Sequence, residues 1–178
     1  MIYLMPEKVG IHERASLFGE AVFASDDGLI TTFAVVAGSA GASFSPSVVL
    51  ILGFANLFAD GLSMATGKYL GVESEIDYEK VEERVMEKHG SPLKIGLVTY
   101  LAFVSAGLLP LLPYILNWGN MFLESSIIVG IALFMIGSFR SRYTHKSWLK
   151  SGLEMFFIGG FAASIAFLVG FLLDKYVV

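Results

Sequence analysis

The chain has 178 residues, of which 55% are hydrophobic and 16% are charged, and its formal net charge is −4. Soluble domains carry about 25% charged residues, so the composition excludes an ordinary soluble domain, and the acidic balance excludes a basic surface for nucleic acid. Because cysteine is absent, disulfides, thiolate metal sites and cysteine nucleophiles are excluded as well.

Five long apolar segments follow one another along the chain. We predict them at residues 17–40, 46–70, 93–115, 121–139 and 149–173. Each is long enough to cross the roughly 30 Å hydrocarbon core of a bilayer as a helix, and the mean hydropathy of the whole chain is +0.70. The sequence therefore predicts an all-α integral membrane protein, with five transmembrane helices in a single membrane domain that covers residues 1–178.

Lysine and arginine are unevenly distributed between the two ends of these segments. Eleven of the 12 lie in the N-terminal stretch, or in and beside the second and fourth connections, whereas Lys175 alone lies at the opposite end. Cytoplasmic connections are enriched in these residues. We therefore predict a cytoplasmic N-terminus and a C-terminus outside, an arrangement that requires an odd number of spans.

The first two spans contain carboxylates, which are costly near the centre of a bilayer. Glu20 and Asp27 lie two helical turns apart on the first span, so they share a face. On the second span, Asn56, Asp60 and Met64 repeat every four residues, again on one face. Because a short connection makes these spans antiparallel neighbours, we expect the two faces to form one metal site.

The donor types indicate which metal this site would take. Carboxylate oxygens with one thioether favour a divalent first-row ion such as Fe²⁺ or Mn²⁺ over magnesium or calcium. No histidine lies within a predicted span, which argues against zinc and copper. Other interpretations remain open, because the run from Asp26 to Gly28 is turn chemistry, Asn56 can join helices by hydrogen bonds, and Met64 can fill a packing gap.

The second connection, residues 71–92, is acidic and is predicted to hold one short cytoplasmic helix from Asp77 to Lys88. Helical spacing places five side chains on one face: Glu79, Glu82, Glu83, Met86 and Glu87. One interpretation is a solvated helix with ion pairs between successive turns. The other is a surface that collects metal at the cytoplasmic entrance, with Glu73 and Glu75 closer to the membrane.

Three segments carry a family resemblance. The run DDGLITTFAVVAGSAGAS followed by GFANLFADGLSMATGKYLGVESE resembles the signature of the vacuolar iron transporter family, and EMFFIGGFAASIAFLVGFLL is similar to its last helix. The resemblance implies a homodimer that exports ferrous iron, and often manganese, from the cytosol by proton antiport. It implies pathway roles for Asp27, Met64 and Glu20. We expect no permanently bound cofactor, and location in the cell (inner) membrane if the chain is prokaryotic or in a vacuolar-type membrane if it is eukaryotic.

The chain departs from the plant members of that family in two places. Those members have a glutamate soon after the Ser-Met-Ala motif, where this chain has Lys68, and their cytoplasmic insertion is a longer, multi-helix metal-binding domain. Glu79, Glu82 and Met86 resemble the acidic, methionine-containing character of that domain. A shorter connection puts high-capacity metal buffering in doubt, while the pathway through the membrane is unaffected.

Small residues recur every four positions on two spans, in the set Ala55, Ala59, Ser63 and Gly67 and in the set Ala162, Ala166 and Gly170. Such stripes allow membrane helices to approach closely. Together with the resemblance they predict a homodimer with the metal path near the subunit interface, although they would serve equally well for packing within one subunit.

The leading hypothesis is therefore a secondary transporter rather than an enzyme. A passive divalent-cation channel or a structural membrane protein is the alternative. An intramembrane aspartyl protease is a remote one, because that enzyme needs a Gly-x-Gly-Asp motif and Asp60 follows Phe58 and Ala59.

Overall fold

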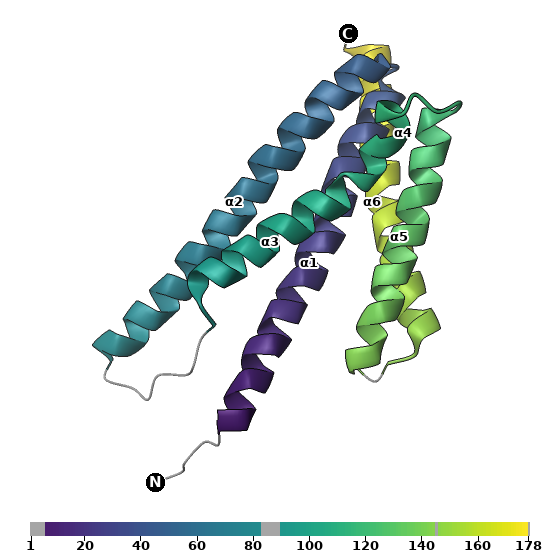
Figure 1. Ribbon diagram of the computed structural model, residues 1–178. Coiled ribbons are helices and arrows are strands. Elements are labelled where there is room, and N and C mark those ends of the chain that lie inside the picture. Colours follow the sequence, from purple (N-terminus) through teal and green to yellow (C-terminus); the bar gives the residue numbers. More distant parts are fainter. Residues whose placement is uncertain (1–5, 83–89, 145, 178) are drawn as a thin grey trace.

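The computed structural model describes residues 6–82, 90–144 and 146–177, and these ranges are helical with short turns and no strand. The helices are α1 (Pro6–Gly41), α2 (Pro46–Val81), α3 (Pro92–Gly107), α4 (Leu112–Ile115), α5 (Met121–Thr144) and α6 (Trp148–Tyr176) (Figure 1). Five segments are long and apolar enough to cross a membrane, with α3 and α4 together forming one of them. The predicted all-α architecture with five spans is confirmed.

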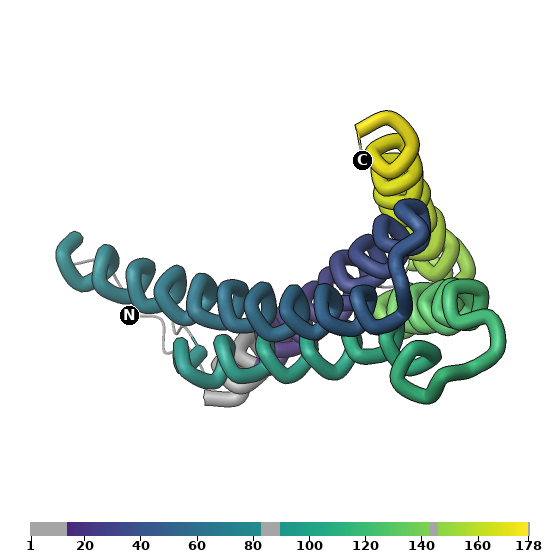
Figure 2. Tube along the Cα trace, turned by 90° about the horizontal axis from the view of Figure 1, so that it is seen from above, coloured from purple at the N-terminus to yellow at the C-terminus, as the bar shows by residue number. Residues whose placement is uncertain are grey.

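Helix α1 lies at the centre of the arrangement. It packs against α3 on one side and against α5 and α6 on the other, while α2 packs mainly on α3. Seen from above, α2 and α3 run side by side away from α1, and α5 and α6 lie together on the opposite side (Figure 2). Helix α1 therefore forms two different interfaces, one with α2 and α3 and the other with α5 and α6.

The helix ends alternate between the two ends of the bundle, as five crossings require. The start of α1, the end of α2, the start of α3 and the α5–α6 connection lie at one end, and the C-terminus lies at the other (Figure 1). The first of these ends is the one to which the sequence assigns nearly all lysine and arginine. Its cytoplasmic orientation remains the prediction made from that charge distribution.

The structure differs from the predicted boundaries in the second connection. Helix α2 continues without a break to Val81, so the short cytoplasmic helix expected to begin at Asp77 is instead the last part of α2. Between Val72 and Val81 no glycine or proline interrupts the helix, and Asp77 pairs with Lys80 one turn later at 2.8 Å. Glu83, Met86 and Glu87 lie outside the described residues.

Within the described ranges, the third span differs from the other four in being broken into more than one helix. Helix α3 ends at Gly107, a 3₁₀ turn covers Leu109–Leu111, and α4 completes the crossing. Pro110 and Pro113 explain the break, because proline lacks an N–H group and its ring collides with the carbonyl four residues earlier in an α-helix.

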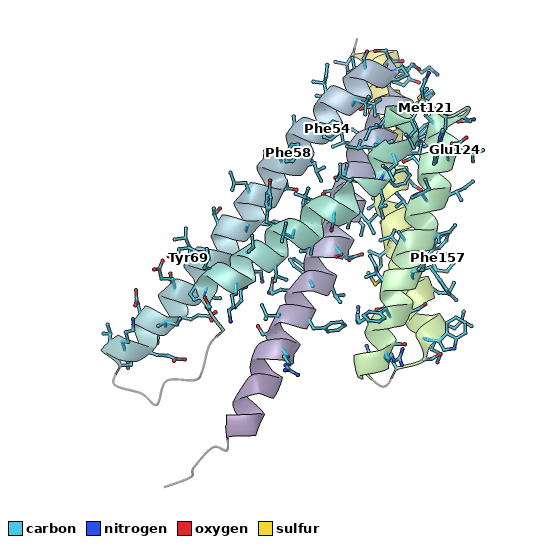
Figure 3. All side chains as sticks on the ribbon, in the orientation of Figure 1. Phe54, Phe58, Tyr69, Met121, Glu124 and Phe157 are labelled. Atoms are coloured by element: carbon cyan, nitrogen blue, oxygen red, sulfur yellow. The ribbon has the colours of Figure 1, made fainter. Side chains whose placement is uncertain are left out.

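Two glycines of α1 and α6 allow backbones to touch. A Cβ atom added to Gly28 would collide with the carbonyl oxygen of Phe103 on α3, and one added to Gly170 would collide with that of Gly38. Large apolar side chains cover the outside of the bundle, including Phe58 on α2 and Phe157 on α6 (Figure 3). This is the surface expected of helices that face lipid.

Candidate metal-transport site

The three carboxylates of the first span lie within one uninterrupted helix. Helix α1 continues unbroken through Glu20, Asp26 and Asp27. The interpretation of Asp26 to Gly28 as a helix break is therefore wrong. Gly28 has a different role, because it lets the backbone of α3 approach α1 next to the two aspartates. All three carboxylates are half-buried in the single chain.

The two adjacent aspartates differ in the charged groups of other helices that lie within electrostatic range of them. Asp27 lies within electrostatic range of Asp60 on α2, whereas Asp26 lies within electrostatic range of Arg140 on α5. The Thr31 hydroxyl donates to the Asp27 carbonyl oxygen at 2.8 Å, so it serves the helix backbone. Of the two aspartates, Asp27 is therefore the one within electrostatic range of the second carboxylate of the predicted site.

The other two predicted donors on α2 are only partly accessible. Asn56 is half-buried, and its Nδ2 atom has no hydrogen-bond partner among the described residues. Met64 is half-buried and packs against the hydrophobic core, which agrees with its alternative interpretation as a packing residue. Buried polar atoms are normally satisfied, so the amide of Asn56 marks a place where a further polar partner fits.

An ion pair that was not predicted from the sequence joins α1 and α2. The Lys68 ammonium on α2 donates to Glu20 Oε1 on α1 at 2.6 Å, and the Glu20 side chain is only 18% exposed. The second oxygen, Oε2, is buried and has no hydrogen-bond partner within the described chain. The signal was present in the sequence, because Lys68 continues the four-residue repeat of Asn56, Asp60 and Met64 by one turn.

The acidic end of α2 carries local interactions of the kind expected on a solvated helix. The Tyr69 hydroxyl donates to Glu73 at 3.2 Å, and Lys80 pairs with Asp77. Glu75 and Glu82 are exposed, whereas Glu79 is half-buried. These contacts leave both predicted interpretations of this surface open.

The carboxylates of the described residues do not gather into one cluster. Among the described residues, no three histidine, aspartate or glutamate side chains are grouped closely enough to hold a metal ion. The interface between α1 and α2 supplies Asp27, Asp60 and neutral donors, which is a partial set.

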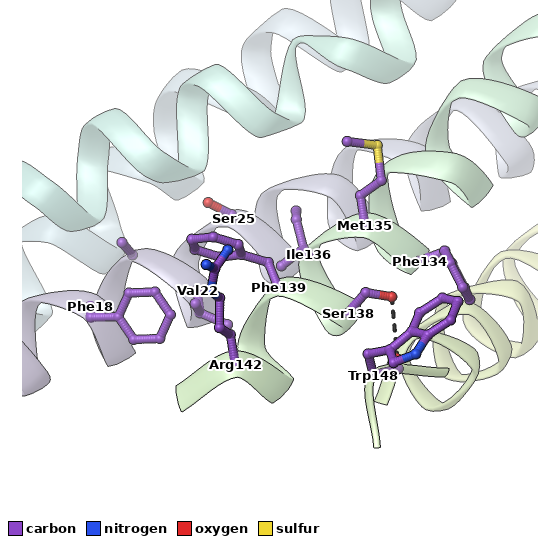
Figure 4. A pocket seen from close by; sticks show the side chains of 11 residues that line it. Phe18, Val22, Ser25, Phe134, Met135, Ile136, Ser138, Phe139, Arg142 and Trp148 are labelled. Carbon is purple, nitrogen blue, oxygen red and sulfur yellow. Dashed lines mark hydrogen bonds between the residues drawn. The ribbon is translucent and has the colours of Figure 1, made fainter. Parts of the chain in front are cut away.

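A pocket of about 740 Å³ lies elsewhere, between α1, α5 and the start of α6 (Figure 4). Apolar side chains such as Phe18, Val22 and Phe139 form most of its lining, and Arg142 extends beside Phe139. None of the five predicted membrane ligands lines it. Its chemistry does not suit a divalent cation, so it is separate from the candidate site.

Comparison with known proteins gives consistent matches along the chain. The family model described as "VIT family" matches residues 18–90 and 81–171. A "Vacuolar iron transporter" of Toxoplasma gondii is 28% identical over 221 residues, covering 86% of this chain and 73% of the relative. "Vacuolar iron transporter 1" of Arabidopsis thaliana is 27% identical over 206 residues, covering 83% and 82% respectively.

The alignments also locate a difference in length. The alignment with the T. gondii relative is longer than this 178-residue chain, so that relative contains segments which this chain lacks. The two matches to the family model overlap at residues 81–90, in the connection between α2 and α3. "Vacuolar iron transporter homolog 2" of A. thaliana, 24% identical, aligns over only 163 residues while covering 87% of this chain and 83% of its own length.

Proposed function

Because the chain belongs to the VIT family and is a membrane metal-ion transporter, we propose that it exports Fe²⁺ and Mn²⁺ from the cytosol in exchange for protons. The observation that carries this proposal is the placement of Asp27 and Asp60 on two neighbouring membrane helices, within electrostatic range of each other. Met64 and Asn56 lie one turn from Asp60 on the same helix and supply a soft and a neutral donor.

The exchange follows from the chemistry of a carboxylate. A carboxylate must lose its proton to bind a metal ion, so proton binding and metal binding compete at the same atoms. Two carboxylates held together in the membrane are favourable only when protons or a cation neutralise them. A proton entering from outside thus displaces the metal ion, and a metal ion entering from the cytosol displaces the protons.

Negative charge at the predicted cytoplasmic end would draw cations toward this site. Glu73, Glu75 and Glu79 lie along the last turns of α2, and Glu82 is the C-cap residue that follows Val81. Lys80 neutralises Asp77 at this end, and the remaining glutamates leave a net negative charge, which raises the local concentration of cations. In this proposal the acidic end of α2 collects metal ions, and Glu20, near the same end of α1, receives them at the entrance of the membrane site.

A homodimer would complete the incomplete ligand set. The small residues of α2, namely Ala55, Ala59, Ser63 and Gly67, are all exposed in the single chain, and a Cβ added to Gly67 would meet no atom within 4 Å. In α6, by contrast, Gly170 of the second stripe is already packed against α1. We therefore assign the α2 stripe to the subunit interface, which would bring two copies of the α1–α2 face together.

Mass measurement in lipid nanodiscs tests this assembly. We expect the mass of a dimer. A single cysteine introduced at Ala59 should form a crosslink with the same cysteine of a second chain. A monomeric mass with transport intact would contradict the assembly.

Reporter fusions test the predicted orientation. A reporter after Val178 is expected outside the cytoplasm, and one at His89 is expected inside it.

Paired recording of metal and pH in proteoliposomes tests the function itself. With an imposed proton gradient, the purified protein should accumulate Fe²⁺ or Mn²⁺ and move protons in the opposite direction. Abolishing the proton gradient should stop uphill metal movement. Metal flux without any proton movement would identify a passive channel instead, and no metal flux under either condition would contradict the proposed function.

A further inference from the structure

We propose that Lys68 acts as a tethered cation: it occupies the entrance carboxylate Glu20 when no metal ion is bound and is displaced by the incoming ion. This inference rests on the proposed role of Glu20 as the entrance to the metal site. It makes Lys68 a residue that sets metal affinity, although a lysine ammonium cannot itself bind a metal cation.

The contact between these two residues joins two helices and is short. Lys68 Nζ lies 2.6 Å from Glu20 Oε1, across 48 positions of sequence. The chain offers a comparison in the pair of Lys80 and Asp77, which is 2.8 Å long but lies within one helix, with both side chains more than half exposed. Exposed pairs of that kind contribute little to stability, whereas the Glu20 side chain is 18% exposed and depends more strongly on its partner.

Glu20 retains an unused ligand atom. Its Oε1 atom accepts the bond from Lys68, whereas Oε2 is buried and has no hydrogen-bond partner within the described chain. A buried carboxylate oxygen without a partner is costly. A divalent cation at Glu20 would satisfy both oxygens, which one ammonium group in its present position does not.

The displaced lysine has a second favourable position close by. Lys68 Nζ lies 5.3 Å from the centroid of the Phe23 ring, which is one turn along α1 from Glu20. An aromatic face attracts an ammonium group at this distance. Because the lysine side chain is long and flexible, its charge can move from the carboxylate toward the ring while α1 and α2 stay in place.

Exchange of one cation for another keeps Glu20 neutralised throughout. An isolated carboxylate in this position would carry the full cost of burial, so its counter-charge cannot simply leave. Lys68 compensates the charge between transport events, and the metal ion takes over when it arrives. The consequence is competition, in which the presence of Lys68 weakens the apparent affinity for metal and speeds the release of an ion from the entrance.

The test compares Lys68→Met with the matched control Lys80→Met. Equilibrium Mn²⁺ binding by purified protein in nanodiscs and half-saturation of Mn²⁺ transport are both measured. Removing the competing charge should lower both half-saturating concentrations about tenfold for Lys68→Met. Lys80→Met should change neither by more than about twofold. Unchanged Mn²⁺ affinity in folded Lys68→Met would overturn the inference.

A charge exchange tests whether the entrance carboxylate must lie on α1, as the inference requires, while the comparison of Lys68→Met with Lys80→Met tests competition itself. The double variant Glu20→Lys with Lys68→Glu keeps an ion pair between α1 and α2 but moves the carboxylate to the other helix. If the pair only holds the helices together, this variant should recover both the thermal stability and the Mn²⁺ affinity of the original chain, which would contradict the inference. We expect it to recover stability and to leave metal entry impaired.

Failure of this inference is distinguishable from failure of the proposed function. If the original chain exchanges Mn²⁺ for protons but Lys68→Met leaves the affinity unchanged, only the role of Lys68 is wrong. If the original chain neither binds nor transports Mn²⁺ or Fe²⁺, the proposed function fails and the inference fails with it.

Discussion

Helix α1 makes two contacts of opposite character. Toward α6 its backbone touches another backbone, at Gly38 against Gly170. Its contact with α2 involves a carboxylate instead. Glu20 on α1 forms an ion pair with Lys68 on α2, and this pair joins the two helices. The first contact leaves no room for an additional atom, while the second contains buried polar atoms whose bonding capacity is unused.

In the proposed function, these two contacts of α1 have different tasks: one holds the helices in place and the other binds the transported ion. Close packing between backbones gives a fixed relative position, since any added atom collides. A metal ion needs the opposite: donors that are held near one another but are not already bonded to one another. In the proposed function, the α1–α6 contact is the frame that holds the helices in place, and the α1–α2 contact is the surface on which ions exchange.

The largest expected effect comes from Asp27→Asn, with Asp26→Asn as its control. The first substitution keeps the shape of the side chain but removes the charge that faces Asp60, so metal flux and coupled proton movement should both fall about 100-fold. Asp26 lies within electrostatic range of Arg140 instead, and its variant should lose less than about threefold. Coupled transport at the original rate by Asp27→Asn would remove the central claim and direct attention to Asp26 or Asp60.

Gly170→Ala on α6 tests whether the close backbone contact between α1 and α6 is the frame of the bundle. The new methyl group would collide with the backbone at Gly38, so the free energy of unfolding should fall by about 1–3 kcal/mol. Gly160→Ala is the control in the same helix, because its Cβ would meet no atom within 4 Å. Denaturation in detergent, followed by circular dichroism, measures both; equal stability of the two variants would contradict the assigned frame.

Replacing Met64 should change selectivity more than rate. Met64→Leu keeps the packing against the core but removes the soft sulfur donor. Because ferrous iron accepts sulfur more readily than manganese does, we expect Fe²⁺ half-saturation to rise about fivefold and Mn²⁺ half-saturation to rise less than twofold. Competition between the two ions in one vesicle preparation measures the ratio, and an unaltered ratio would leave Met64 as a packing residue only.

The smallest effect is expected at the acidic end of α2 and beyond it. The quadruple variant with Gln at Glu79, Glu82, Glu83 and Glu87 should reduce metal uptake about threefold at low metal concentration, because cations are no longer concentrated there. Uptake at saturating metal should not change, since the membrane site is intact. Identical uptake at all metal concentrations would favour the solvated-helix interpretation.

The number and position of the spans could be predicted because they depend on local properties. The length of an apolar run and the hydrocarbon thickness of a bilayer together define a crossing, and all five predicted crossings are present in the structure. Helical periodicity also identified which residues share a face, such as Asp60 and Met64. The sequence motifs pointed to the family that the comparisons then showed.

What each face meets was decided only by the tertiary structure. Asp26 and Asp27 are adjacent in sequence, yet Asp26 lies within electrostatic range of Arg140 on α5 and Asp27 within electrostatic range of Asp60 on α2. Similarly, two stripes of small residues look alike in sequence, but Gly170 is buried against α1 while Gly67 is exposed. Periodicity relates residues within one helix, whereas their partners depend on where helices cross and how closely they approach, and those relations join residues far apart in the chain.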